Sequence, residues 1–128
     1  MEARVREKTI KVFLIDDNRF FLESLTFILN LKKDMEVVGT TTRGGDALLK
    51  IKELTPDVVV VDMVLPDRDG LSLLAEIREQ YDIPVIMLSM YEEYRNQAIR
   101  RGAFTYLVKG EGLDQLYHAI RKATVLDR

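Results

Sequence analysis

The chain has 128 residues, 47% of them hydrophobic, and its 19 Lys and Arg residues nearly balance its 21 Asp and Glu residues, for a formal net charge of −2. This length predicts one domain, and the charge balance argues against a dedicated nucleic-acid-binding domain, which usually shows a strong basic excess. The absence of cysteine excludes disulfides, thiolate metal sites and thiol nucleophiles, and the single histidine, His118, excludes a site built on two imidazoles.

No apolar run is long enough to span a membrane and no signal peptide follows Met1, so we expect a cytoplasmic protein with no membrane contact. Residues 1–8 are rich in charged side chains that cannot be buried together, which predicts a flexible N-terminal tail. The folded domain is then expected to occupy residues 9–128.

Short runs rich in Val and Ile alternate with stretches of helical spacing along this domain. The runs, each predicted to be a strand, are Ile10–Ile15, Met35–Gly39, Val58–Val61, Val85–Leu88 and Phe104–Val108. The apolar stripes between and after them are Phe21, Leu25, Ile28 and Leu29; Ala47, Leu48, Ile51 and Leu54; Leu73, Leu74 and Ile77; Ala98 and Ile99; and Leu113, Leu116, Tyr117 and Ile120. His118 lies one step off the last stripe and is expected to face solvent.

Five strand-then-helix units predict an α/β fold. Nearly unbroken apolar runs are typical of strands that are covered on both faces, as in a parallel sheet. Helices are therefore expected on both faces of one parallel sheet.

Polar residues stand where four of the predicted strands end. Asp16 and Asp17 follow the first strand, Asp62 the third, Ser89 the fourth and Lys109 the fifth. Ligands of open α/β sheets bind outside the carboxyl ends of the strands. The sequence therefore predicts a site at this rim.

The three aspartates point to a bound cation. An aspartate after a strand is also a common helix cap, and a lone serine or lysine there is commonly a loop residue. Asp62 is harder to explain in this way, because a carboxylate on an apolar strand is costly to bury without a partner. Like charges at one rim repel each other unless a cation joins them, and carboxylates without imidazole or thiolate suit Mg²⁺.

The charges of such a site favour phosphoryl transfer. Three carboxylates, one Mg²⁺ and Lys109 sum to near neutrality, so an added phosphoryl group could be held by the metal, Lys109 and the Ser89 hydroxyl. This is the arrangement that phosphoryl transfer needs. Asp62 is the candidate nucleophile, which would form an aspartyl phosphate.

From residue 9 to about residue 125 the chain resembles the response regulator receiver domain of bacterial two-component systems. Four segments carry the resemblance: Asp16-Asp17, the run from Val58 to Gly70, the pair Leu88-Ser89, and the run from Gly102 to Lys109. The second of them contains Asp62, Val64, Leu65-Pro66 and Asp69. The resemblance implies a flavodoxin-like (βα)5 three-layer sandwich with strand order 2-1-3-4-5. A weaker resemblance is to the DNA-binding NarL/FixJ subgroup.

The resemblance also implies a role for each matching residue. Asp62 corresponds to the phospho-accepting aspartate, which makes the protein a phospho-accepting regulatory domain and not an enzyme. The Mg²⁺ ligands would be Asp16, Asp17, Asp62 and the main-chain carbonyl of Val64. Ser89 and Lys109 would contact the phosphoryl group.

A switch and an output surface are further implications of the resemblance. Ser89 would move toward the phosphoryl group and Tyr106 would rotate inward, changing a surface that includes Tyr94, Arg95 and Arg101. A half-buried aromatic residue on an edge strand is the alternative for Tyr106. The implied partners are a sensor histidine kinase, a downstream effector protein or domain that could bind DNA, and a second copy on phosphorylation. Both a free-standing receiver and the regulatory part of a longer transcription factor fit.

The sequence was also compared with two other functions, and at Gly110 it differs from many receiver domains. An aspartyl-phosphate hydrolase of the haloacid dehalogenase type needs a second aspartate two residues after the nucleophile, where this chain has Val64. A flavodoxin-like cofactor-binding domain needs a phosphate-binding first loop, where Asp16 and Asp17 would repel phosphate. Many receivers have proline after the lysine, whereas Gly110 follows Lys109, which leaves the geometry of this peptide bond open.

Overall fold

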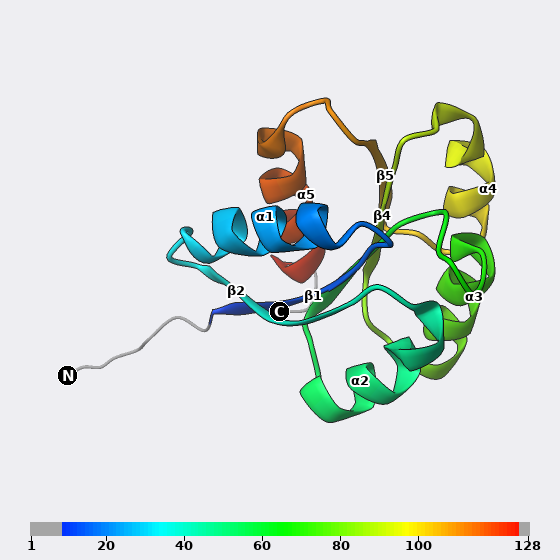
Figure 1. The fold of residues 1–128 in the computed structure, drawn as a ribbon, viewed down its shortest axis with the longest axis horizontal. Coiled ribbons are helices and arrows are strands. Elements are labelled where there is room, and N and C mark those ends of the chain that lie inside the picture. The colour runs from blue at the N-terminus through cyan, green and yellow to red at the C-terminus, as the bar shows by residue number, and fades with distance from the viewer. Residues whose placement is uncertain (1–8, 126–128) are drawn as a thin grey trace.

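The computed structural model describes residues 9–125, which form five parallel strands in one sheet (Figure 1). The strand order is β2-β1-β3-β4-β5, so the predicted α/β fold and the order implied by the family are confirmed. The strands are β1 (Ile10–Ile15), β2 (Met35–Thr41), β3 (Val58–Val61), β4 (Val85–Ser89) and β5 (Thr105–Val108). The predicted N-terminal tail, residues 1–8, lies outside the described residues.

Helices cover both faces of the sheet, which gives three layers (Figure 1). Helices α1 (Arg19–Asn30) and α5 (Leu113–Val125) pack on one face. Helices α2 (Ala47–Leu54), α3 (Gly70–Gln80) and α4 (Arg95–Arg100) pack on the other. Short 3-10 turns at Gly44–Asp46 and Glu92–Tyr94 precede α2 and α4.

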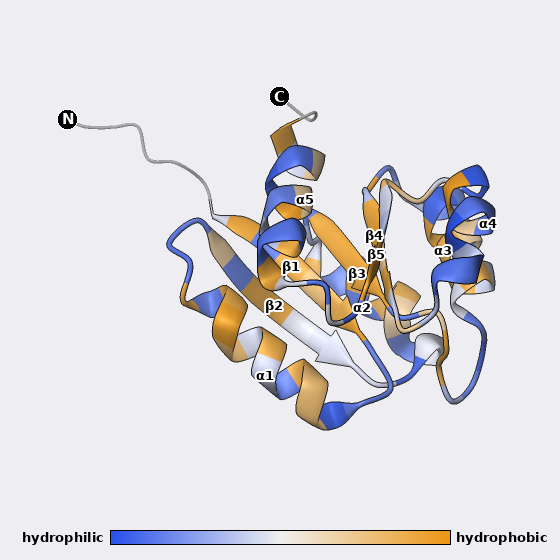
Figure 2. Ribbon diagram, turned by 90° about the horizontal axis from the view of Figure 1, so that it is seen from above, coloured by the Kyte–Doolittle hydropathy of each residue, from blue (hydrophilic) through white to orange (hydrophobic). Residues whose placement is uncertain are grey.

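The unbroken valine run of β3 explains the centre of the core. All four valines are buried, and alternate residues belong to the clusters on opposite faces of the sheet: Val58 and Val60 on the α1/α5 side, Val59 and Val61 on the other. Successive strand residues point to opposite faces, so a strand covered by helices on both sides needs apolar residues at every position. In Figure 2 the central strands β1, β3 and β4 are mostly hydrophobic, whereas the helices carry hydrophobic and hydrophilic residues in alternation.

Three boundaries and one stripe differ from the sequence predictions. Strand β2 extends to Thr41, because Thr40 and Thr41 pair with the last two residues of β1. Ser89 pairs with Val108 and so belongs to β4, and β5 starts one residue later than expected. The stripe predicted for α4 is half wrong, since Ala98 is buried but Ile99 is 45% exposed on this one-and-a-half-turn helix.

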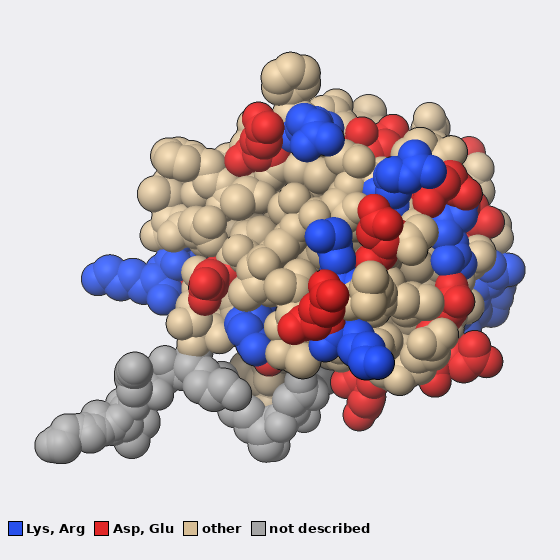
Figure 3. Space-filling view, turned by 60° about the horizontal axis from the view of Figure 1, so that its bottom comes forward, with Lys and Arg blue, Asp and Glu red and all other residues tan. Residues whose placement is uncertain are grey.

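Charges of both signs are interspersed on the surface. On the face drawn in Figure 3, Lys and Arg side chains alternate with Asp and Glu, and this face carries no extended basic patch. Among residues 9–125, no helix has both the length and the hydrophobicity that crossing a membrane would require.

Candidate functional site

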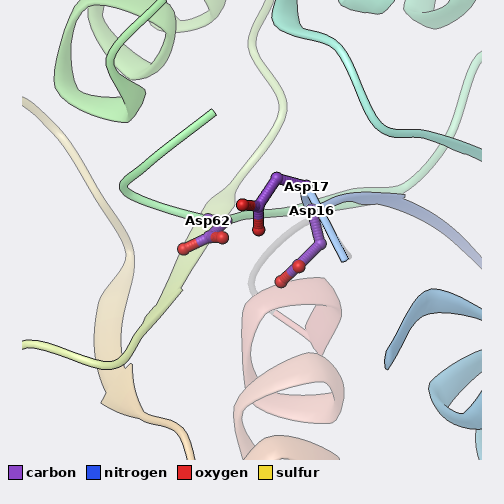
Figure 4. Close-up of side chains that lie close together, drawn as sticks. All are labelled: Asp16, Asp17 and Asp62. Atoms are coloured by element: carbon purple, nitrogen blue, oxygen red, sulfur yellow. The ribbon is translucent and has the colours of Figure 1, made fainter. Parts of the chain in front are cut away.

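The three aspartates predicted to share a site lie together at the carboxyl ends of two neighbouring strands. Asp16 and Asp17 directly follow β1 and Asp62 directly follows β3, and these strands pair through Ile15 and Val61. One carboxylate oxygen from each of the three lies within 4.8 Å of the others (Figure 4). Asp16 and Asp62 are buried, whereas Asp17 is exposed. Parallel pairing therefore turns two separate sequence motifs into one acidic cluster.

The cap of helix α1 is Asn18, so the helix-cap alternative for the preceding aspartates is wrong. The Oδ1 of Asn18 accepts a hydrogen bond from Phe21 N at 3.0 Å. Asp16 instead accepts from the main-chain N–H of Asn18 at 2.9 Å, through its Oδ1. Asn18 therefore caps the helix, and the second carboxylate oxygen of Asp16, Oδ2, is available to the site.

Lys109 reaches the cluster from the end of β5. Its Nζ lies 2.6 Å from Asp16 Oδ2 and 3.5 Å from Asp62 Oδ2. The same ammonium lies 4.4 Å from the centre of the Phe21 ring, a distance typical of a cation–π contact. From its spacing, Phe21 was expected only on the core stripe of its helix. Its position in the first helical turn after Asp17 is the feature of the sequence that places it near the site.

Burial and crowding change the acidity of the two buried carboxyls. Burial, and then the neighbouring charge of Asp16, raises the pKa of Asp62 to about 6, while Lys109 opposes this rise. Burial also raises the pKa of Asp16, again against the effect of Lys109. Both shifts have the sign expected of carboxylates that lack a sufficient positive partner.

The loop after Asp62 is held close to it by a glycine. A β-carbon on Gly70 would overlap the main-chain oxygen of Asp62 and lie 2.7 Å from Met63 Cα. Gly70 N donates to Met63 O at 2.6 Å. Glycine is required here by space, because a positive φ is found at Gly102, Gly110 and Gly112 but not at Gly70.

Val64 lies on this loop, two residues after Asp62. Its side chain is 52% exposed, and its main-chain N–H is 3.5 Å from Asp62 Oδ1. The metal-ligand role of its carbonyl stays a prediction. The Lys109–Gly110 bond, whose geometry the sequence left open, is trans.

Ser89 and Tyr106 are joined through the main chain of Tyr91. The N–H of Tyr91 donates to Ser89 Oγ at 3.0 Å, and the hydroxyl of Tyr106 donates to the carbonyl of Tyr91. Sequence reasoning did not find this link, because main-chain groups leave no trace in the residue type.

Tyr106 is fully buried, at 0% exposure, although β5 is an edge strand. The half-buried alternative is therefore wrong. The ring already lies inward in this structure, so its inward rotation on phosphorylation stays a prediction. Arg95 of helix α4 covers the ring. The guanidinium of Arg95 lies 5.3 Å from the ring centre, and its Nη1 donates to Tyr106 O at 2.7 Å. The Nε of Arg95 lies 2.6 Å from Glu92 Oε2, which holds the guanidinium in place. His118, expected to face solvent, is exposed.

This fold and this acidic rim are shared with a known protein family. The family model of the response regulator receiver domain matches residues 12–121. The chain therefore belongs to the response regulator receiver domain family, as the resemblance implied.

Two curated relatives and one solved structure show the range of proteins in which such a domain occurs. The uncharacterized transcriptional regulatory protein YvfU of Bacillus subtilis is 36% identical over 116 residues, which are 88% of this chain and 58% of that protein. Protein-glutamate methylesterase/protein-glutamine glutaminase 1 of Syntrophomonas wolfei is 38% identical over 106 residues, 80% of this chain and 30% of that protein. The response regulator domain of Thermotoga maritima CheB superimposes with a TM-score of 0.85 at 30% identity, covering 94% of this chain and 100% of that one. The chain thus spans 30% to 58% of the length of these curated relatives.

Proposed function

We propose that the protein accepts a phosphoryl group on Asp62 from a histidine kinase and passes this signal to a partner through a change at Tyr106. The observation that carries the proposal is the geometry of the rim, where three carboxylates lie within 4.8 Å and Lys109 lies 3.5 Å from Asp62. The protein would act as a phospho-accepting regulatory domain, with no substrate turned over.

The covalent step follows from the position of Asp62. One carboxylate oxygen attacks the phosphorus of a phosphohistidine, and the phosphorus–nitrogen bond breaks as the phosphorus–oxygen bond forms. The imidazole leaves with the bonding electron pair and takes up a proton from solvent. Asp62 must be ionised to attack, and Lys109 favours that form because it lowers the pKa that burial has raised.

The donor set fits Mg²⁺. Three carboxylates with no imidazole or thiolate among them are the hard oxygen ligands this ion prefers, and Mg²⁺ is commonly held by one or two carboxylates together with phosphate oxygens. Asp16, Asp17, Asp62 and the carbonyl of Val64 would hold it. When bound, the ion neutralises charge on the phosphoryl oxygens.

Labelling with a small phosphodonor tests the proposal. Incubation with acetyl phosphate and Mg²⁺ is expected to add the mass of one phosphoryl group, seen by intact mass spectrometry, and Asp62→Asn or removal of Mg²⁺ is expected to abolish it. Continuous release of phosphate at many turnovers would instead favour the aspartyl-phosphate hydrolase, and a bound flavin the cofactor-binding domain. Labelling that survives in Asp62→Asn would overturn the assignment.

The output surface is expected to respond through Tyr91. When the Ser89 hydroxyl turns to the phosphoryl group, Tyr91 moves with it, and the acceptor of the Tyr106 hydroxyl moves in turn. This is a two-state change biased by a local charge. The surface that would read it out comprises α4, β5 and α5.

Replacing Tyr106 with alanine is expected to uncouple the surface from the site. In a ¹⁵N-labelled protein with Mg²⁺ and beryllofluoride, the wild type should show amide shifts at both Ser89 and Arg101, whereas Tyr106→Ala should retain only those at Ser89. Tyr106→Phe, which keeps the ring, measures the part due to the hydroxyl. Unchanged shifts at Arg101 in Tyr106→Ala would remove Tyr106 from the switch.

The partners follow from the family and remain part of the proposal. A sensor histidine kinase would supply the phosphoryl group, and the curated relative that is a transcriptional regulator favours an effector domain or protein that acts on DNA. This agrees with the NarL/FixJ likeness. A dimer formed on phosphorylation is a further expectation.

A further inference from the structure

The segment from Thr41, the last residue of β2, through the loop to α2 carries none of the predicted site residues, yet it is bonded to both loops that carry the aspartates. On one side, the carbonyl of Thr41 accepts a hydrogen bond from Asp16 N at 3.1 Å. On the other side, the loop contacts Asp67, which lies five residues after Asp62. The two acid-bearing loops therefore share one neighbour.

Asp67 uses both of its carboxylate oxygens on this neighbour. Its Oδ1 accepts from Gly44 N at 2.9 Å and its Oδ2 accepts from Gly45 N at 2.8 Å. Hydrogen bonds with an ionised acceptor are stronger than neutral ones, and two bonds from one carboxylate fix its orientation as well as its position. Asp67 therefore ties the loop after Asp62 to the loop that holds Asp16.

The two glycines allow the loops to approach this closely. A β-carbon at Gly44 would lie 2.7 Å from Arg68 Cγ and 3.2 Å from Leu65 Cδ1, and one at Gly45 would lie 3.0 Å from Asp67 Oδ2. Larger residues would push the loop after Asp62 away. The contact is thus built from both sides.

Arg68 ties the same loop to α3. Its Nη1 lies 2.7 Å from Glu76 Oε1 and its Nη2 donates to Ser72 Oγ at 2.8 Å. The segment containing Asp67 is therefore held by α3 on one side and by the 3-10 turn before α2 on the other, and the backbone of Val64 is held between this anchor and Asp62. Val64 pairs with Asp69 in an isolated bridge.

From these contacts we propose that Asp67 is a positioning residue for the metal ligands. It holds Asp62 and Val64 at a fixed separation from Asp16 and Asp17, so that the four oxygen donors are arranged before Mg²⁺ binds. Mg²⁺ demands near-ideal octahedral geometry, so a loosened loop costs affinity. This inference rests on the proposed function, because it concerns the same site.

Calorimetric titration of the metal-free protein with Mg²⁺ tests the inference. Asp67→Ala is expected to weaken Mg²⁺ binding about tenfold, the lower end of the range for residues that orient metal ligands. The matched control is Asp57→Ala, since Asp57 also accepts a main-chain N–H from another element, Lys11 N at 2.8 Å, but at the opposite ends of the strands. Its Mg²⁺ affinity is expected to match that of the wild type.

Two further readouts separate positioning from a general loss of stability. Amide exchange at Gly44 and Gly45 should speed up in Asp67→Ala but not in Asp57→Ala. The rate of labelling by acetyl phosphate should return toward the wild-type rate when Mg²⁺ is raised to saturation. If Asp67→Ala fails to fold, Asp67→Asn, which keeps one acceptor oxygen, gives the affinity measurement with a smaller expected loss.

The outcomes distinguish the two claims. A wild-type protein that neither binds Mg²⁺ nor accepts a phosphoryl group would overturn the proposed function. A wild-type protein that does both, with an Asp67 variant that binds Mg²⁺ equally well, would overturn this inference alone.

Discussion

Replacing Lys109 with alanine is expected to destabilise the metal-free protein by about 3 kcal/mol at about pH 8, the low end of the cost of leaving a buried charge without its partner. The ammonium is the cation closest to two buried carboxylates, at 2.6 Å from Asp16 and 3.5 Å from Asp62. Without it, both carboxylates must either remain ionised at a distance where they repel each other or bind protons.

The pH dependence gives the sign of this effect. Lys109 lowers the pKa of both carboxyls, so its removal raises those values further. In acid, where both groups are protonated, little is left for the lysine to neutralise, and the destabilisation should fall as the pH falls. Urea unfolding of the wild type and of Lys109→Ala, from acidic pH to about pH 8, measures this difference in the free energy of unfolding.

Mg²⁺ provides the control for Lys109→Ala. If the acids form a cation site, the ion should restore much of the lost stability while phosphoryl acceptance stays impaired, because the positive contact to the phosphoryl group is missing. A variant as stable as the wild type in EDTA at about pH 8 would show that Lys109 does not balance these charges.

Replacing Asp62 with asparagine is expected to have the opposite effect on stability and to raise it by about 3 kcal/mol at about pH 8 in the absence of metal. Burial raises the pKa of this carboxyl from 3.8 to about 6, so keeping it ionised in the folded protein is costly. Asparagine has nearly the same shape and carries no charge, so the cost disappears with the substitution.

The window of the effect follows from the two pKa values. Below about pH 4 the group is protonated in both states and the substitution should change little. Between about pH 4 and pH 6 the unfolded chain ionises while the folded protein keeps its proton, so wild-type stability falls as pH rises. Above about pH 6 the difference from Asp62→Asn should be constant.

Asp17→Asn is the matched control, because Asp17 belongs to the same cluster but is exposed. It should change metal-free stability much less than Asp62→Asn. Added Mg²⁺ should stabilise the wild type more than either variant. A pH-independent difference between the wild type and Asp62→Asn would show that its stability does not depend on the charge of Asp62.

Strand positions and the acidic motifs could be predicted from sequence because each depends on neighbouring residues. The four valines of β3 predict a strand covered on both faces, and such a strand is found. The order of the strands came from the family likeness and not from periodicity, since apolar spacing is the same whichever strands are neighbours. The predicted burial of Ile99 was wrong because α4 is too short for the spacing of its apolar residues to define a buried face.

Other features of the site depend on contacts between main-chain groups and on residues distant in sequence. Asn18 was not predicted as the cap because three polar residues in a row could each have served. The Tyr91 link and the Asp67 anchor use N–H and C=O groups that every residue possesses, so no residue type marks them.

By itself, the sequence determined that the chain is an α/β domain with Asp16, Asp17, Asp62, Ser89 and Lys109 at strand ends, because hydrophobic periodicity and the abrupt change from apolar to charged residues are local properties. Only the tertiary structure decided that the carboxylate oxygens lie within 4.8 Å, that Tyr106 is buried and that the β2–α2 loop joins both acid-bearing loops. These depend on which strands pair and how closely the loops pack. The residues concerned lie far apart in the chain and meet only when the sheet has formed.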